Sequence, residues 1–138
     1  MHKIYTLGTS ARSPEEFRRI LNKFGIRRLI DVRRFPTSKL RHFKKNNLET
    51  MLARENIEYI YLGVLLGGYR EEGYPSYMKS ELFSQGIEKL RSYIEDKVSC
   101  IVCAEKFYQK CHRRFIAQCL KENYAVIHII EEDCIQEE

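Results

Sequence analysis

Hydrophobic and polar positions are arranged along the chain in two alternating patterns, which predict five strands separated by helices. Short runs of β-branched and aromatic residues are typical of buried strands. They occur at Lys3–Leu7, Arg28–Val32, Tyr59–Leu62, Val98–Cys103 and Ala125–Ile130. Between these runs, apolar residues recur three and four positions apart, the spacing of a helix that buries one face. The predicted order is β-α-β-α-β-α-β-α-β.

The first helix has the clearest boundaries. Ser13 is a typical N-cap, Pro14 suits the first helical position, and Gly25 is a typical residue just after a helix. We predict further helices through Leu48, Met51 and Leu52, from Tyr77 to Ile94, and over Cys111–Glu122. A Gly-rich connection, Gly63–Pro75, precedes the third of these four helices, and its tyrosines predict an ordered loop that covers a ligand.

Strands that are all separated by helices predict a parallel sheet covered on both faces. The expected fold class is α/β, a three-layer α/β/α architecture with a five-stranded, mainly parallel sheet, Rossmann-like or flavodoxin-like. The 138 residues form one predicted domain, and the acidic end at 131–138 is expected to fray.

Composition indicates where such a domain works. No apolar run is long enough to cross a membrane, and the first residues lead straight into a strand, so we expect neither a membrane span nor a signal peptide. The five cysteines have no spacing typical of secreted disulfide frameworks. A reducing cytoplasm fits them best, with thiols that are buried or functional.

Charge is distributed unevenly between the two parts of the chain. Residues 1–54 carry 14 Lys and Arg against 4 Asp and Glu, whereas residues 55–138 carry 10 against 15. A basic half suggests a phosphate-bearing or polyanionic partner, and the alternative is a set of solvated helix faces. The predicted loop 33–45 interleaves cations with Phe35, His42 and Phe43. This pattern is typical of nucleic-acid stacking surfaces, and equally of a loop whose rings dock on the core.

Reactive residues follow the ends of four predicted strands. Ser10 follows the first strand, Asp31 and Arg33 end the second, Gly67 and Gly68 follow the third, and Cys103 and Glu105 end the fourth. Ligands of open α/β sheets bind beyond the carboxyl ends of the strands. We therefore predict one shared site at this edge of the sheet.

Each candidate also has a structural interpretation. Asp31 and Arg33 point the same way on an extended chain, as a functional clamp or as an ion pair that fixes the loop. Arg33 and Arg34 together have the fork geometry that suits phosphate. Cys111 is either a buried hydrophobe or a thiol activated in a first helical turn beside His112.

A structural metal site is not predicted. Cys100 and Cys103 face opposite sides of a strand, and no second spaced pair of ligands follows them. We expect no cofactor.

Three segments together resemble a known family. They are Leu29-Ile-Asp-Val-Arg-Arg-Phe-Pro-Thr-Ser38, Leu66-Gly-Gly68, and Cys103-Ala-Glu105 with Cys111-His-Arg113. The combination resembles the group called domain of unknown function 488. The resemblance implies an α/β/α fold without an established activity, and it marks signature positions that include Pro36, Ser38, His112 and Arg113. A weaker likeness links the Asp-Val-Arg strand and Cys103 to rhodanese-type sulfurtransferases, although the loop after Cys103 lacks glycine and arginine.

The predicted function is an anion-binding active site, an enzyme that acts on a phosphate- or nucleotide-bearing substrate. The predicted catalytic residues are Asp31, Cys103, Glu105, Cys111 and His112. The predicted substrate-binding residues are Ser10, Arg33, Arg34, Ser38, Gly67, Gly68 and Arg113. The alternatives are a non-catalytic nucleic-acid-binding module that uses residues 33–45, and a rhodanese-like sulfurtransferase. The sequence leaves the reaction class and the oligomeric state open.

Overall fold

Helices cover both faces of a single six-stranded sheet. The computed structural model describes residues 2–36 and 40–138. The strands are β1 (His2–Gly8), β2 (Arg28–Asp31), β3 (Glu58–Tyr61), β4 (Ser99–Cys103), β5 (Tyr124–Glu131) and β6 (Cys134–Glu137). The α-helices are α1 (Pro14–Lys23), α2 (Lys45–Arg54), α3 (Gly63–Leu66), α4 (Tyr74–Tyr77), α5 (Glu81–Ile94) and α6 (Arg113–Leu120), and the short 3-10 helices are η1 (Arg41–Phe43) and η2 (Tyr108–Lys110).

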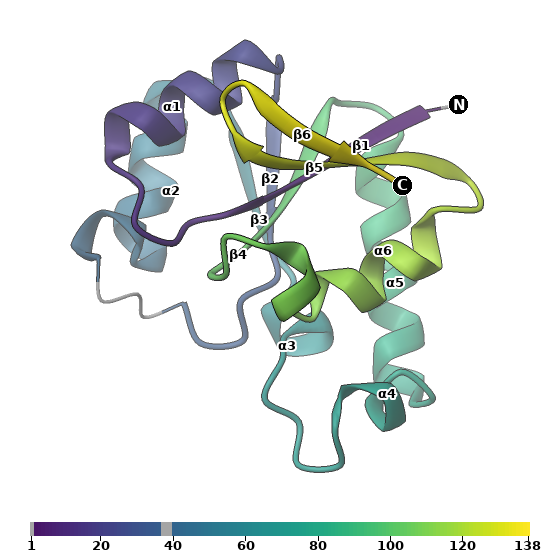
Figure 1. Cartoon of the computed structure of the whole chain (residues 1–138). Helices are drawn as coiled ribbons and strands as arrows, with labels where there is room; N and C mark the ends of the chain where they lie inside the picture. Colours follow the sequence, from purple (N-terminus) through teal and green to yellow (C-terminus); the bar gives the residue numbers. More distant parts are fainter. Residues whose placement is uncertain (1, 37–39) are drawn as a thin grey trace.

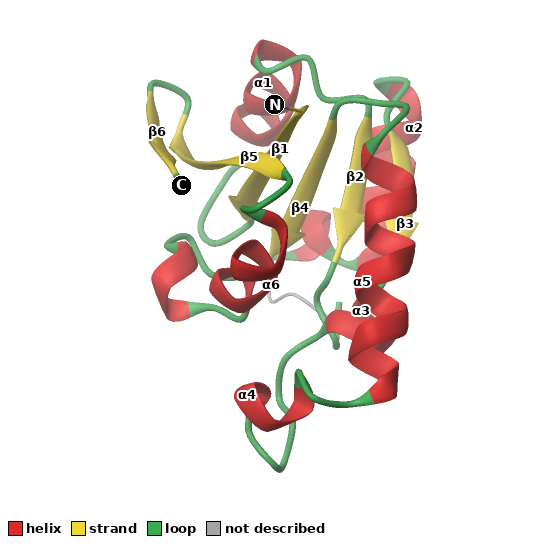
Figure 2. Ribbon diagram, turned by 90° about the vertical axis from the view of Figure 1, so that its right-hand side faces the viewer, coloured by secondary structure: helices red, strands yellow, loops and turns green. Residues whose placement is uncertain are grey.

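The strands lie in the order β3-β2-β4-β1-β5-β6, which Figure 2 shows face on. The first five strands are parallel, and β6 runs antiparallel to β5. The α/β class and the parallel strands agree with the prediction. The Rossmann and flavodoxin orders both place the first two strands side by side, whereas here β4 lies between β2 and β1. The resemblance to those folds is therefore limited to the layers.

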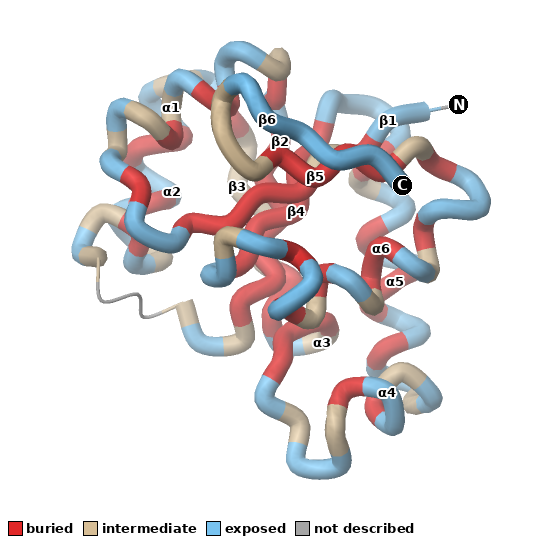
Figure 3. Tube along the Cα trace, in the orientation of Figure 1, coloured by how far each residue is buried: buried red, intermediate tan, exposed pale blue. Residues whose placement is uncertain are grey.

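The sixth strand was not expected. Residues 134–137 pair with β5 instead of fraying, so the prediction of a frayed end is wrong for these residues. All four residues of β6 are exposed, as Figure 3 shows beside the buried β5. The strand is held by its backbone pairing and buries no side chain that a sequence pattern could reveal.

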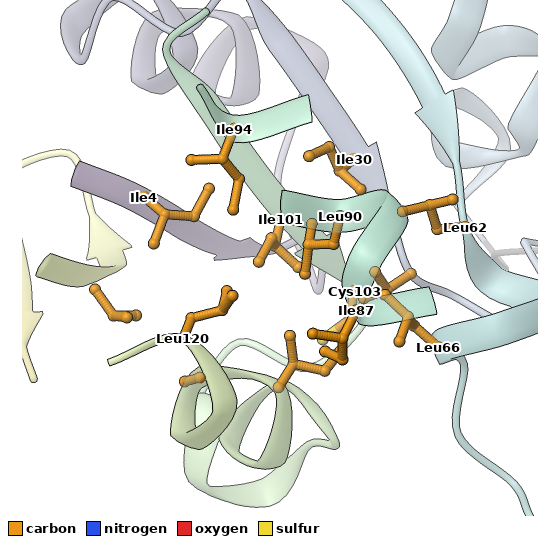
Figure 4. Packing of buried hydrophobic residues seen from close by; sticks show 14 of the residues in the cluster. Ile4, Ile30, Leu62, Leu66, Ile87, Leu90, Ile94, Ile101, Cys103 and Leu120 are labelled. Carbon is orange, nitrogen blue, oxygen red and sulfur yellow. The ribbon is translucent and has the colours of Figure 1, made fainter. Parts of the chain in front are cut away.

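Two hydrophobic cores fill the space between the sheet and its helices. Figure 1 shows α1 and α2 on one side of the strands and α5 and α6 on the other. Consecutive residues of β4 serve the two cores in turn, because strand side chains alternate between faces. Cys100 packs with α1 and α2, whereas Ile101 and Cys103 pack with α5 and α6. Figure 4 shows Ile101 and Cys103 among the side chains of this second core.

The helices after β3 differ from the prediction in their boundaries. The segment expected to be one helix from Tyr77 to Ile94 is divided, because α4 ends at Tyr77 and Ser80 caps α5 by accepting the Phe83 N–H at 3.2 Å. The last helix, α6, covers Arg113–Leu120 and is shorter than expected at both ends. Cys111 therefore lies before the helix, next to the N-cap residue His112. No helix in the described ranges is long and apolar enough to cross a membrane.

Candidate functional site

A cleft of about 1270 Å³ opens at the carboxyl end of the sheet. The loops after β1, β2 and β4, the segment after α3, and the start of α6 all contribute to its walls. Its lining comprises Thr9, Ser10, Ala11, Arg33, Arg34, Phe35, Leu40, Gly68, Tyr69, Arg70, Tyr74, Cys103, Ala104, Glu105, Gln109, Lys110, Cys111, His112, Arg114 and Phe115. The loops that follow the four predicted strands thus meet in one cavity.

Arg33 is fixed in the cleft wall by a fully buried carboxylate. The guanidinium donates to both oxygens of Asp31, through Nε and Nη2 at 2.9 Å each, and through Nη1 to the Phe43 carbonyl. Tyr59 donates its hydroxyl to the same carboxylate. Burial is the largest single influence and acts to lower the pKa of Arg33, but the hydrogen bonds and charges of Asp31 and Tyr59 together outweigh it and the pKa is raised.

Asp31 itself does not reach the cleft. Its side chain is 0% exposed, and both oxygens are occupied by Arg33 and Tyr59. Asp31 therefore positions Arg33, which matches the ion-pair interpretation of this motif. The interpretation of Asp31 as a catalytic group does not fit this geometry.

His112 presents one bare ring nitrogen towards a sulfur. Its Nε2 lies 3.0 Å from the Val32 carbonyl, which can only accept, so Nε2 carries the proton. Nδ1 then holds the lone pair, and it lies 3.7 Å from Cys111 Sγ. Burial is the main cause that lowers the pKa of His112 to about 4, and the charges of Arg113 and Arg70 add to it. The ring is therefore neutral near pH 7.

Arg113 lies beneath the cleft and not in its lining. The side chain is 1% exposed, and its guanidinium donates to Thr6 Oγ1 at 3.0 Å and to the Glu105 carbonyl at 2.6 Å. It also contacts the Lys106 carbonyl. Its donors thus hold the loop after β4 against β1, which is a structural role and differs from the predicted contact with substrate.

Cys103 and Cys111 meet in the cleft wall. Cys103 ends β4, Cys111 precedes α6, and their sulfurs are paired as a disulfide with the Cα atoms 7.7 Å apart. The other cysteines, Cys100, Cys119 and Cys134, are free. The spacing of the cysteines in the sequence did not predict this pairing.

The lining is strongly cationic. Besides Arg33 it contains Arg34, Arg70, Lys110 and Arg114, whereas Glu105 is its single carboxylate among the described residues. Arg34 and Arg70 donate to backbone carbonyls, of Tyr69 for the first and of Gly67 and Val64 for the second.

Four of the cleft cations lie outside ion-pair distance of any carboxylate in residues 2–36 and 40–138, namely Arg34, Arg70, Lys110 and Arg114. Their charge is therefore not neutralised by the protein.

Aromatic rings and unusual backbone mark the rim. Phe35 is 60% exposed and Tyr69 is 83% exposed, with their ring centres 6.0 Å apart. Tyr69 and Ala11 also adopt positive φ angles of 60° and 59°. Left-handed backbone is costly for residues with a side chain and is common at functional sites. Two of the three such non-glycine residues in the described chain thus line this cleft.

Most of the predicted site residues are brought together. The cleft is lined by eight of them, namely Ser10, Arg33, Arg34, Gly68, Cys103, Glu105, Cys111 and His112. Gly67 stands behind the lining, where a Cβ would come within 2.4 Å of the Arg34 Cβ, so its role is close backbone packing. Ser38 lies outside the described residues.

Sequence reasoning missed several cleft residues. Tyr74 belongs to the Gly-rich connection, and Lys110 and Arg114 flank the Cys-His-Arg segment. Each lies within two residues of a position that was singled out or in the loop expected to cover a ligand. Their neighbourhood was therefore a signal, but their side-chain directions were not predictable.

A family model described as domain of unknown function DUF488 matches residues 13–120. The chain belongs to the DUF488 family. The DUF488 match contains the cleft lining from Arg33 to Phe115, whereas Thr9, Ser10 and Ala11 precede it. Comparison with curated proteins and with solved structures finds no match. Within the part of this DUF488 chain that the structure describes, no group of three or more His, Cys, Asp or Glu is placed to hold a metal ion.

Proposed function

We propose that the cleft binds a phosphate-bearing small molecule, and that a nucleotide is the class of ligand it suits. The observation that carries the proposal is the set of cleft cations without a carboxylate partner, Arg34, Arg70, Lys110 and Arg114. Guanidinium groups match phosphate oxygens in a two-pronged geometry. An anion that enters the cleft would therefore replace water around charges that the protein leaves unneutralised.

The aromatic rim suits a nucleobase attached to the phosphate. Phe35 and Tyr69 leave most of their ring surface exposed, and an aromatic ring stacked on a base contributes about 1–3 kcal/mol. Arg34 connects the two features, because its guanidinium lies 5.3 Å from the Phe35 ring centre and donates to the Tyr69 carbonyl. A ligand with a planar base and a phosphate would use both parts of the cleft.

The proposal extends to an enzyme through two groups in the lining. The Glu105 carboxylate is exposed in the cleft and has no ion-pair partner among the described residues. His112 Nδ1 is an unprotonated base beside the Cys111 sulfur. We assign proton transfer to or from the bound ligand to Glu105, and we keep Cys103 and Cys111 as candidate nucleophiles in their reduced form.

The test is a calorimetric titration, in which AMP, adenosine or inorganic phosphate is added to the reduced protein and the heat of binding is measured. AMP is expected to bind at least tenfold more tightly than adenosine. Arg114→Ala is expected to weaken AMP binding about tenfold, a loss of about 1.4 kcal/mol, whereas Lys89→Ala, an exposed cation of α5, is the matched control and leaves it unchanged. Tyr69→Ala is expected to weaken AMP binding but not phosphate binding. Equal affinities for AMP and adenosine would refute the proposal.

The same titration distinguishes the proposal from the alternative, a non-catalytic nucleic-acid-binding module. In the segment 33–45, Phe43 is 0% exposed and packs on Phe17, and the His42 ring nitrogen bonds to the Arg12 carbonyl. These contacts favour a loop docked on the core, and they leave Phe35 as the exposed ring. Binding of a single-stranded oligonucleotide with steep salt dependence, without binding of AMP, would favour the module instead.

The sulfurtransferase alternative finds no supporting contact around Cys103 among the described residues. A persulfide carrier needs N–H donors around its sulfur, whereas the neighbour of Cys103 Sγ is the Glu105 carbonyl oxygen at 4.0 Å. We therefore do not propose it.

A further inference from the structure

The Cys103–Cys111 pair suggests an activity that goes beyond anion binding. Disulfides usually have Cα separations of about 4.4–6.8 Å. The Cα atoms of this pair lie 7.7 Å apart, so the two cysteines are more widely spaced than in a usual disulfide. Both cysteines line the cleft, where Cys111 is 9% exposed and Cys103 is 1% exposed. A small reagent in the cleft can therefore meet this sulfur pair.

The two segments stay together without the sulfur bond. The loops after β1 and β4 are joined by the Ser10 N–H, which donates to the Ala104 carbonyl at 2.9 Å. Arg113 ties the start of α6 to the Glu105 carbonyl. The disulfide is thus not needed to bring Cys103 and Cys111 near each other, so it can open and close within an intact fold.

The surroundings of the two sulfurs differ. Cys111 Sγ accepts the Arg113 N–H at 3.4 Å and faces the bare Nδ1 of His112 at 3.7 Å. An N–H donor and nearby cations stabilise a thiolate, and Nδ1 lies where it can accept a hydrogen bond from the thiol and relay its proton. Cys103 Sγ instead faces a carbonyl oxygen, which suits a thiol and not a thiolate. Cys111 is the better nucleophile of the pair.

We propose that Cys111 and Cys103 form a reversible dithiol–disulfide couple that reduces hydroperoxides in the cleft, with Cys111 as the attacking thiol. In the first step, Cys111 Sγ attacks the peroxide while its thiol proton is relayed through His112 Nδ1, which forms no lasting imidazolium. The O–O bond breaks, and the leaving oxygen takes the proton from the imidazole to become water or an alcohol. Cys111 is oxidised to a sulfenic acid.

In the second step, Cys103 Sγ attacks Cys111 Sγ. The S–O bond breaks, the hydroxyl group leaves with the Cys103 proton as water, and the disulfide forms. A small-molecule thiol then reduces the disulfide by exchange, and two molecules of that thiol become its own disulfide. One hydroperoxide is reduced for every two external thiols oxidised.

The experiment uses reduced protein in a Cys134→Ser background, because the exposed Cys134 would link separate chains. One equivalent of hydrogen peroxide is added, free thiols are alkylated, and intact mass is recorded. The expected product has lost two hydrogens and two alkylation sites, and dithiothreitol restores both. Cys119→Ser is the matched control, because Cys119 lies on α6 outside the lining, and it should behave identically.

Single replacements test the order of the two cysteines. Cys103→Ser is expected to stop at a sulfenic acid on Cys111, seen as one added oxygen that a dimedone probe captures. Cys111→Ser is expected to react at least tenfold more slowly and to form no disulfide. Peptide mapping of the unsubstituted protein, quenched early with dimedone, gives the same answer if a variant does not fold. A native protein that resists dithiothreitol, or a probe that labels Cys103 first, would overturn the proposal.

Discussion

His112 should make the fold sensitive to acid. In the unfolded chain its pKa returns to the ordinary value of 6.5, whereas in the folded protein burial and the neighbouring arginines lower it to about 4. Between these two values the unfolded state binds more protons. The free energy of unfolding therefore rises with pH, and it falls as the pH drops from 6.5 to 4.

The size of the effect follows from the shift. At pH 5 the neutral ring costs the fold about 2 kcal/mol relative to neutral pH, and at pH 4 about 3 kcal/mol. A domain of this size has a total stability of about 5–15 kcal/mol, so the loss is measurable by urea unfolding at several pH values.

The comparison needs a variant that does not titrate. His112→Gln can donate an amide N–H to the Val32 carbonyl in place of Nε2 and remains neutral at all these pH values. His128, whose pKa is also lowered by burial, titrates in both proteins and cancels in the difference. The wild type should lose about 2 kcal/mol more than the variant between pH 7.5 and pH 5. Parallel losses in the two proteins would refute the reasoning.

Two further predictions concern the cleft wall. Asp31→Asn leaves the Arg33 guanidinium buried without its counter-charge, so urea unfolding should show a loss of about 3–5 kcal/mol; a loss below about 1 kcal/mol would contradict the clamp. Gly8→Ala places a Cβ 1.9 Å from the Glu105 carbonyl oxygen. In Gly25→Ala the new Cβ meets no atom, and the change is destabilising only because the backbone φ there is +67°. The first change should therefore cost more than the second, which is expected at about 1–2 kcal/mol; equal losses would mean that the loop after β4 moves freely.

The strands and helices that bury at least one face were predictable from the sequence. The N-cap at Ser13 and the stripe of Phe17, Ile20 and Leu21 specify α1 locally, and the structure buries those three residues. The edge strand β6 was not predictable, because its exposed residues carry no burial pattern. The strand order was also out of reach, since it depends on which helices pack together.

The position of the cleft was predictable, but the contacts of the individual candidate residues were not. Parallel strands bring their carboxyl ends to one edge, and this topological rule located the cleft. The burial of Asp31 and Arg113 depends on partners far along the chain, such as Tyr59 and Thr6, that no local pattern reveals. The pairing of Cys103 with Cys111 likewise depends on how the chain returns after its 3-10 turn.

The carbonyl contacts of Arg34 and Arg70 affect the entropy that is lost when a charged ligand binds in the cleft. Long cationic side chains usually sample many rotamers, and fixing one on binding costs about 0.5–1.5 kcal/mol. Here the Tyr69, Gly67 and Val64 carbonyls already hold the two guanidinium groups in place. That loss of freedom was incurred when the chain folded. The two arginines thus form a preorganised part of the cleft.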